Sequence, residues 1–256
     1  MLPREHGAYG QIAFPLIAAY AVAGVSTASL LMTVTVIAGF LAHEPAAIVL
    51  GQRGGRVKRE LGASATRWLV CCLAVGIAAG LAAVSRLDAI TRWSLAIPAV
   101  PAVALMLAMI KGREKSWFGE AAAALAFAGA AVPIALAAGA SMDMALAVAI
   151  PFALLFTTTT LAVRVVVLRV RGGGDPGAAA ATQRAALILS GISTLMIGAL
   201  AMTGWLASSV LIAAAPGLLT GVTVAVRPPA ATRLRSLGWS LVAVSTLTTL
   251  IVIATA

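Results

Sequence analysis

The stretch LAHEPAAIVLGQRGGRVKRE, residues 41–60, joins the end of a long apolar segment to a run of basic residues. His43, Glu44 and Pro45 stand side by side in the apolar part, and Gly51 lies about 12 Å farther along a helix rising 1.5 Å per residue. An ionisable group at that depth costs roughly 2.5–3.5 kcal/mol in hydrocarbon. We therefore expect these side chains to face protein or a wet cavity, with a helix bend at Pro45. A buried hydrogen-bond network without a functional role is the alternative.

The composition indicates a membrane protein. The chain of 256 residues is 61% hydrophobic and 10% charged, whereas an average soluble domain carries about 25% charged residues. Its mean hydropathy is +1.04. A membrane-crossing helix needs about 20 mostly apolar residues. We predict an all-α, multi-pass membrane bundle that forms one transmembrane domain over residues 1–256. The predicted spans, about nine, are approximately 8–25, 28–50, 68–85, 93–110, 118–140, 143–168, 185–205, 207–226 and 236–255.

Lysine and arginine are distributed unevenly among the connections between these spans. When nine spans alternate, 16 of the 18 basic residues fall on one side of the membrane, and Arg86 and Arg92 fall on the other. An excess of lysine and arginine marks cytoplasmic loops. We therefore predict a protein of the bacterial inner membrane with its N-terminus in the cytoplasm and its C-terminus outside. Part of the positive charge could also attract anionic lipids or an anionic ligand.

A second polar group precedes the first span. The segment REHGAYGQ, residues 4–11, again places a histidine beside a glutamate near the predicted cytoplasmic face. Helix capping or an interfacial position would explain these residues without a function. The pairing with His43 and Glu44 favours one shared cavity instead. The residues of this group that we predict to line it are Arg4, Glu5, His6 and Gln11.

Charged residues at other predicted helix ends extend this site. Glu120 falls in the first turn of its span, where a carboxylate also suits the positive helix end, and it could pair with Lys115 or Arg164. Snorkelling to the interface is the alternative for Arg164. We predict His43 and Glu44 as the catalytic residues, acting in proton chemistry or as a hydrogen-bond donor–acceptor pair. The predicted substrate-binding residues are Arg4, Glu5, His6, Gln11, Arg53, Lys115, Glu120 and Arg164.

The cysteines and histidines argue against a cofactor. Cys71 and Cys72 are adjacent, and two cysteines with two histidines are too few for an ordinary four-ligand zinc site. We expect the cysteines to pack as small apolar residues. Axial ligation of one haem by His6 and His43 is the least favoured reading. We predict no metal, no haem and no nucleic-acid partner.

Three stretches resemble the YwiC-like family of integral membrane proteins. They are REHGAYGQIAFPL, FLAHEPAAIVL with the basic residues after it, and SWFGEAAAALAFAGAAVPIALAAG, all within the first 140 residues. The resemblance implies a multi-pass membrane protein. It does not imply a particular reaction.

The span pattern is also similar to that of the UbiA prenyltransferase superfamily, whose members hold magnesium and a prenyl diphosphate. Those enzymes use an Asn-Asp pair followed by further aspartates. At the matching places this chain has His43 and Glu44, then Ala47 and Gly51, and its second loop keeps Asp175 alone. Magnesium sites for diphosphates need several carboxylates, so we predict no magnesium.

These observations lead to two hypotheses of different classes. The first is a cytoplasm-facing polar and basic cavity that binds an anionic or isoprenoid-like amphiphile or other membrane lipid, in a divergent UbiA-like transferase or a binder. The second is a proton-coupled transporter or accessory permease with His43 and Glu44 as its proton site. A cavity open to one side favours the first, and a path reaching both faces favours the second.

Overall fold

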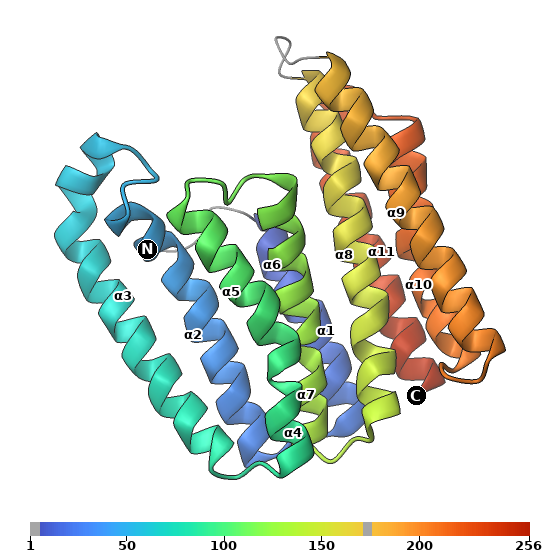
Figure 1. Ribbon diagram of the computed structural model, residues 1–256, viewed down its shortest axis with the longest axis horizontal. Coiled ribbons are helices and arrows are strands. Elements are labelled where there is room, and N and C mark those ends of the chain that lie inside the picture. The colour runs from blue at the N-terminus through green and yellow to red at the C-terminus, as the bar shows by residue number, and fades with distance from the viewer. Residues whose placement is uncertain (1–5, 171–175) are drawn as a thin grey trace.

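The computed structural model describes residues 6–170 and 176–256, and its regular secondary structure within these ranges is entirely helical (Figure 1). Eight helical segments are long and apolar enough to cross a membrane, counting α4 with α5 and α6 with α7, and α1 is a shorter apolar helix. The predicted all-α, multi-pass membrane bundle is confirmed. The helices are α1 His6–Ala23, α2 Thr27–Val49, α3 Gly55–Val84, α4 Ala89–Ser94, α5 Ala96–Ile110, α6 Trp117–Gly129, α7 Ala131–Ala137, α8 Met142–Val170, α9 Pro176–Met202, α10 Ser208–Val226, a 3₁₀ turn Ala231–Arg233, and α11 Leu234–Thr255.

The spans predicted at 28–50 and 68–85 leave residues 51–67 as a long connection, and this prediction is wrong, because α3 already begins at Gly55. The segment between Gly55 and the apolar part of α3 has no proline and is rich in residues that favour helices. An ion pair four residues apart, from Arg56 Nε to Glu60 Oε1 at 2.8 Å, adds local support. The connection between α2 and α3 is therefore short, and its position is set tightly by the two helix ends.

Helix α8 lies at the centre of the bundle (Figure 1). It packs against α1, α6 and α7 on one side and against α9, α10 and α11 on the other, while α2 and α3 form a peripheral pair. The contact with α10 is the closest, because a Cβ atom added to Gly217 would lie 2.8 Å from Leu155 Cα. A Cβ added to Gly221 would lie 3.0 Å from Thr158 Cβ. Small residues spaced by four thus let these two helix backbones approach each other.

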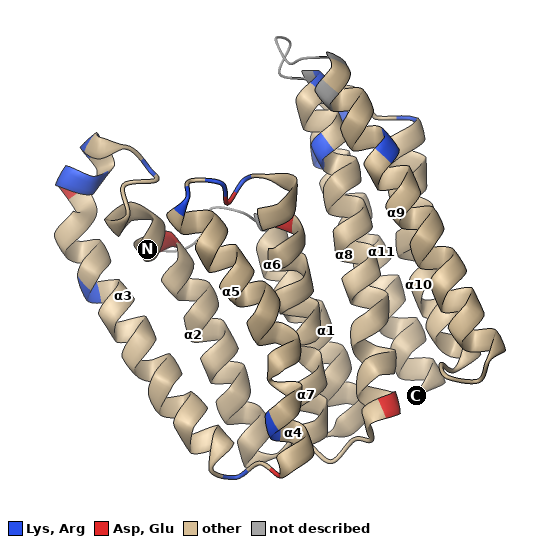
Figure 2. Cartoon of the chain, in the orientation of Figure 1, with Lys and Arg blue, Asp and Glu red and all other residues tan. Residues whose placement is uncertain are grey.

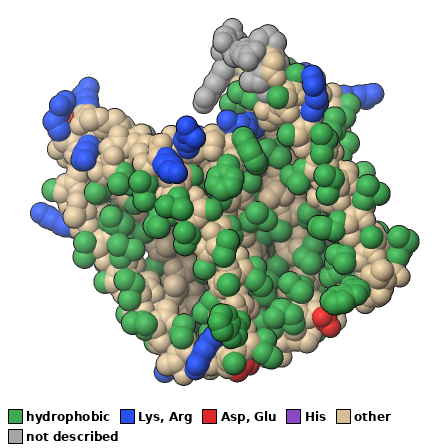
Figure 3. Space-filling model, viewed as in Figure 1, with side chains coloured by type: hydrophobic (Ala, Val, Ile, Leu, Met, Phe, Trp, Pro, Cys, Tyr) green, Lys and Arg blue, Asp and Glu red, His purple; other side chains and the backbone are tan. Residues whose placement is uncertain are grey.

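Charge and hydrophobicity divide the surface of the molecule. Lysine and arginine gather at the end that carries the α2–α3, α5–α6 and α10–α11 connections, which we call the basic end (Figure 2). Arg86, Asp88, Arg92 and Asp143 lie at the opposite end. Hydrophobic side chains cover the wall between the ends in the view of Figure 3. Many large hydrophobic residues of the chain, such as Trp93 and Leu195, are exposed. So large an apolar surface fits contact with lipid.

The close approach of α8 and α10 gives a test of the packing. Gly217→Ala should lower the free energy of unfolding by about 1–3 kcal/mol, because the added methyl group meets the backbone of α8. Gly198→Ala in α9 is the matched control, since a Cβ there meets no atom within 4 Å. We expect the control to be neutral or to stabilise by up to about 1 kcal/mol. The thermal stability of both purified variants can be measured by heating them and quantifying the remaining folded protein by size-exclusion chromatography. Equal stability of the two variants would contradict this packing.

Candidate functional site

Helices α2 and α5 end in the same way at the basic end. Gly51 follows α2 with a φ of +80° and donates its N–H to the carbonyl of Ile48 at 2.9 Å. Gly112 follows α5 with a φ of +68° and donates to the carbonyl of Met109 at 2.9 Å. In each case the next residue bonds to the carbonyl one position farther back, which completes a Schellman motif. At both glycines the polypeptide is thereby turned back across the end of the bundle.

The residues two positions after these glycines meet in an ion-pair cluster. Arg53 donates from Nη2 to Glu44 Oε2 and from Nη1 to Glu114 Oε1, both at 2.7 Å, and its Nε lies 3.0 Å from Glu44 Oε1. His43 Nε2 lies 3.3 Å from Glu114 Oε2. We call these four residues the Arg53 cluster. The side chains of Glu44 and Glu114 are 13% and 9% exposed, so each carboxylate lies mostly out of water, and the two share the one positive charge of the guanidinium.

The electrostatics of the Arg53 cluster favour a permanent charge. The hydrogen bond to Glu44 is the largest of the effects that raise the pKa of the Arg53 guanidinium above its ordinary value, and Glu114 adds to it. Arg53 occupies the place between the two carboxylates that a bound cation would take. Among the described residues, no group of three or more metal-binding side chains is arranged to hold a metal ion.

Two further contacts hold the loop between α5 and α6, residues 111–116. Gln52 donates from Nε2 to the carbonyl of Met109 at 3.1 Å, which ties the α2–α3 turn to the end of α5. At the start of α6, the side chain of Ser116 accepts the N–H of Gly119 at 3.2 Å. A Cβ on Gly119 would collide with the carbonyl of Glu114, so glycine is required for this close approach.

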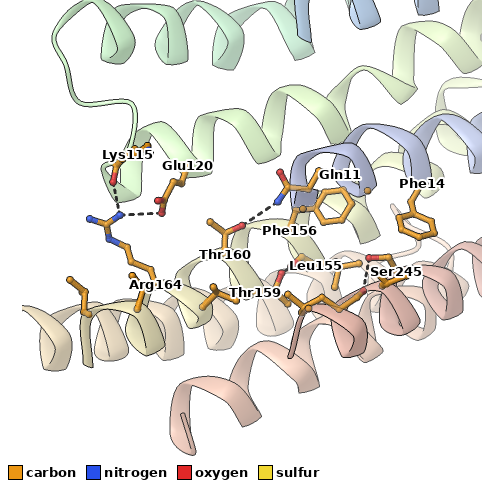
Figure 4. A pocket seen from close by; sticks show the side chains of 18 residues that line it. Gln11, Phe14, Lys115, Glu120, Leu155, Phe156, Thr159, Thr160, Arg164 and Ser245 are labelled. Carbon is orange, nitrogen blue, oxygen red and sulfur yellow. Dashed lines mark hydrogen bonds and ion pairs between the residues drawn. The ribbon is translucent and has the colours of Figure 1, made fainter. Parts of the chain in front are cut away.

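A cavity of about 430 Å³ lies beside this loop, between α1, α8, α11 and the start of α6 (Figure 4). At one end, Arg164 Nη1 donates to the carbonyl of Lys115 at 2.6 Å and to Glu120 Oε2 at 3.2 Å. Pairing of Glu120 with Arg164 is one of the two pairings expected from the sequence. Farther in, Gln11 Nε2 donates to Thr160 Oγ1 at 3.3 Å. The cavity therefore has a charged end and a short polar section.

The rest of the cavity wall is mostly apolar. Phe14 from α1, Leu155 and Phe156 from α8, and Val242 from α11 line it, and Ser245 adds a hydroxyl group (Figure 4). That hydroxyl is used within its own helix. It donates to the carbonyl of Leu241 at 2.8 Å. An elongated molecule that is charged at one end and apolar along its length matches this pattern.

The structure distributes the predicted site residues over two neighbouring groups. Gln11, Lys115, Glu120 and Arg164 line the cavity. His43, Glu44 and Arg53 belong to the Arg53 cluster and are not among the residues that line the cavity. The expectation that all of them share one cavity is therefore wrong for the described residues. The physical reason is that Arg53 satisfies Glu44 locally. Arg4, Glu5 and Asp175 lie outside the described residues, and so does the side chain of His6.

Sequence reasoning missed two residues that hold this end together, Glu114 and Gln52. Glu114 follows the glycine after α5 by two residues, just as Arg53 follows the glycine after α2. The matching spacing of an acid and a base behind two helix-ending glycines was a signal that could have paired them. Gln52 gave no comparable signal, because its partner is a backbone carbonyl.

The Arg53 cluster predicts that glutamate-to-glutamine substitutions at positions 114 and 60 change the free energy of unfolding by different amounts. Glu114→Gln should lower the free energy of unfolding by about 1.5–3 kcal/mol, because hydrogen bonds to charged groups are worth that much when little water competes. Glu60→Gln removes the exposed partner of Arg56, whose side chain is 85% exposed, and should change it by less than about 1 kcal/mol. Thermal unfolding of both purified variants decides. A loss for Glu114→Gln no larger than for Glu60→Gln would show that the cluster does not hold the loop.

Comparison with known proteins identifies a family but no characterised relative. A family model described as YwiC-like protein matches residues 2–135, which include α1 to α6, the Arg53 cluster and the charged side chains from Lys115 to Glu120. No curated protein and no solved structure matches the chain. The resemblance to the UbiA superfamily is not tested by these comparisons and stays a prediction. The match covers more than half of the chain, and the protein belongs to the YwiC-like family.

Proposed function

We propose that the protein binds an amphiphile with an anionic head group and a hydrocarbon tail in the cavity between α1, α8 and α11. The single observation that carries the proposal is the division of this cavity into a charged end and a long apolar section. Its volume of about 430 Å³ falls within the range of roughly 300–1,000 Å³ that is typical of small-molecule sites. A cavity of this shape suits neither a fully polar nor a fully apolar ligand.

Arg164 is the proposed head-group ligand. Its hydrogen bonds to described residues both use Nη1, so Nε and Nη2 are left to a ligand on that side of the guanidinium. A guanidinium fixed in this way can bind a phosphate or carboxylate with two parallel hydrogen bonds. Glu120 and the carbonyl of Lys115 position the group and compensate part of its charge. The side chain is 25% exposed, which leaves room for a ligand to approach.

The apolar section suits a branched or isoprenoid-like chain. Two phenyl rings, from Phe14 and Phe156, and the aliphatic side chains of Leu155 and Val242 line it. Burial of each methylene group against such a wall contributes about 0.8 kcal/mol. The tail then provides most of the binding free energy, and the head group fixes the orientation.

The Arg53 cluster supports this site indirectly. Glu114 and Lys115 are consecutive, so the cluster holds one side of the loop whose other side anchors Arg164. Proton chemistry by His43 and Glu44 stays a prediction, and the proposed binding does not require it. The excess of lysine and arginine favours the basic end as the cytoplasmic end in a bacterial inner membrane, so we propose that the cavity takes its ligand from that side.

Binding can be tested with a pair of ligands and a pair of variants. Farnesyl phosphate should raise the thermal stability of the purified protein, whereas farnesol at the same concentration should raise it less. Arg164→Gln should weaken binding of the phosphate by about tenfold or more, because it removes charge-assisted hydrogen bonds. Arg67→Gln, on an exposed part of α3, is the matched control and should bind as the unaltered protein does.

Lipid mass spectrometry of the purified protein supplies an independent readout. An anionic amphiphile should copurify with the unaltered protein and with Arg67→Gln, and should be depleted in Arg164→Gln. Equal depletion of the lipid in both arginine variants would indicate that the lipid responds to the loss of any positive charge and not to Arg164 itself. Equal binding of farnesyl phosphate by all three proteins would overturn the assignment of Arg164.

A further inference from the structure

A second cavity lies at the opposite end of the seam between α8 and α11. Its volume is about 180 Å³. Met144 and Val148 from the start of α8 and Val252 and Thr255 from the end of α11 line it. The larger cavity is lined by the other halves of the same two helices. Since α8 and α11 run in opposite directions (Figure 1), the two cavities lie toward opposite ends of these helices; α1 and α6 complete the lining of the larger one, and α10 completes that of the smaller one.

About two turns of α8 and of α11 separate the two cavities. On α8 this interval extends from Val148 to Leu155, and on α11 from Ser245 to Val252, seven residues in each case. Seven residues of α-helix span about 10 Å. The residues near the middle of these intervals are Phe152 and Thr248, both fully buried at 0% exposure. Phe152 packs against the wall of the larger cavity, because its ring centroid is 5.8 Å from that of Phe156, which lines that cavity.

Thr248 differs from the hydroxyl residues beside it. Ser245 and Thr249 each donate to the backbone carbonyl four residues earlier, at 2.8 Å. The Oγ1 of Thr248 is buried and has no hydrogen-bond partner among the described residues. Positions 245, 248 and 252 share one face of a helix, so this hydroxyl lies between the two cavities. A buried hydroxyl without a partner is unfavourable unless another state or a bound solute satisfies it.

We propose that the two cavities are the two mouths of one passage for water and small uncharged polar solutes, closed in this structure by the packed side chains between them, Phe152 and Thr248 included. The charged residues of the two linings, Lys115, Glu120 and Arg164 at one mouth and Asp143 at the other, lie outside the interval between Val148 and Leu155. An ion would lose its hydration in that interval without compensation, whereas a neutral solute can bond to the hydroxyl group. This activity goes beyond the proposed ligand binding and does not depend on it.

Cysteine accessibility tests this closure directly. In a background with Cys71→Ala and Cys72→Ala, Thr248→Cys should react slowly with a small water-soluble methanethiosulfonate in membrane vesicles. Adding Phe152→Ala should raise this rate by about tenfold or more. The loss of a buried phenyl ring weakens the packing of this interval by more free energy than corresponds to a tenfold change in its opening equilibrium. Thr158→Cys is the matched control. Thr158, on α8, is as fully buried as Thr248, but it faces Gly221 of α10. Its rate should not change.

Solute flux shows whether the opened interval connects both ends. In proteoliposomes, Phe152→Ala should increase glycerol permeability, measured by stopped-flow light scattering, over that of the unaltered protein. An unchanged rate at position 248, an equal rise at position 158, or reaction at 248 without faster glycerol entry would each overturn the passage. Phe152→Leu replaces Phe152→Ala if the latter fails to give a monodisperse protein, with a smaller change in the same direction. Loss of farnesyl phosphate binding would leave this result untouched.

Discussion

The basic end of the molecule depends on one constraint, that a carboxylate removed from water needs a compensating charge. Glu44 lies within α2 and Glu114 in the loop after α5, and both are nearly buried. A single guanidinium, Arg53, reaches both at 2.7 Å. Either carboxylate left alone in an apolar bundle would be strongly unfavourable. Arg53, which belongs to the short connection between α2 and α3, therefore holds the ends of α2, α3, α5 and α6 in one arrangement.

This constraint reaches the cavity through the peptide chain. The side chain of Glu114 points to the Arg53 cluster, and the carbonyl of Lys115, the next residue, accepts from Arg164 on α8. The same short loop thus joins the α2–α5 part of the bundle to the central helix. Gly119 makes this possible, because any larger residue would push the start of α6 away from the carbonyl of Glu114. A hydrogen bond to a loop carbonyl is a precise but fragile way to orient a guanidinium, so the loop must be held from its other side.

Much of the fold followed from local properties of the sequence, whereas the site depended on long-range contacts. The lengths of the apolar segments predict the helices, and the depth of Glu44 predicts that it needs a partner. Its partner Arg53 is only nine residues away, but the second partner of that arginine, Glu114, is 61 residues from it, and only the matching spacing behind two glycines indicated this pair. Arg164 and Glu120 are 44 residues apart, and their pairing could be named only as one of two choices. The early start of α3 was missed because a basic segment was interpreted as a loop, although charged residues with long side chains are good helix formers.

The packing of α8 bears on where the larger cavity lies. On the side of α10, Gly217 and Gly221 bring the backbones so close that side chains of α8 contact the opposite main chain. On the side of α11, the residues that line the cavities include Gly238 and Ser245 at one end and Val252 at the other. A central helix drawn tightly to one neighbour cannot pack equally well against another on a different face. The larger cavity is lined by α8 and α11 but not by α10, as this division requires, whereas the smaller one also reaches Val210 and Ala213 of α10.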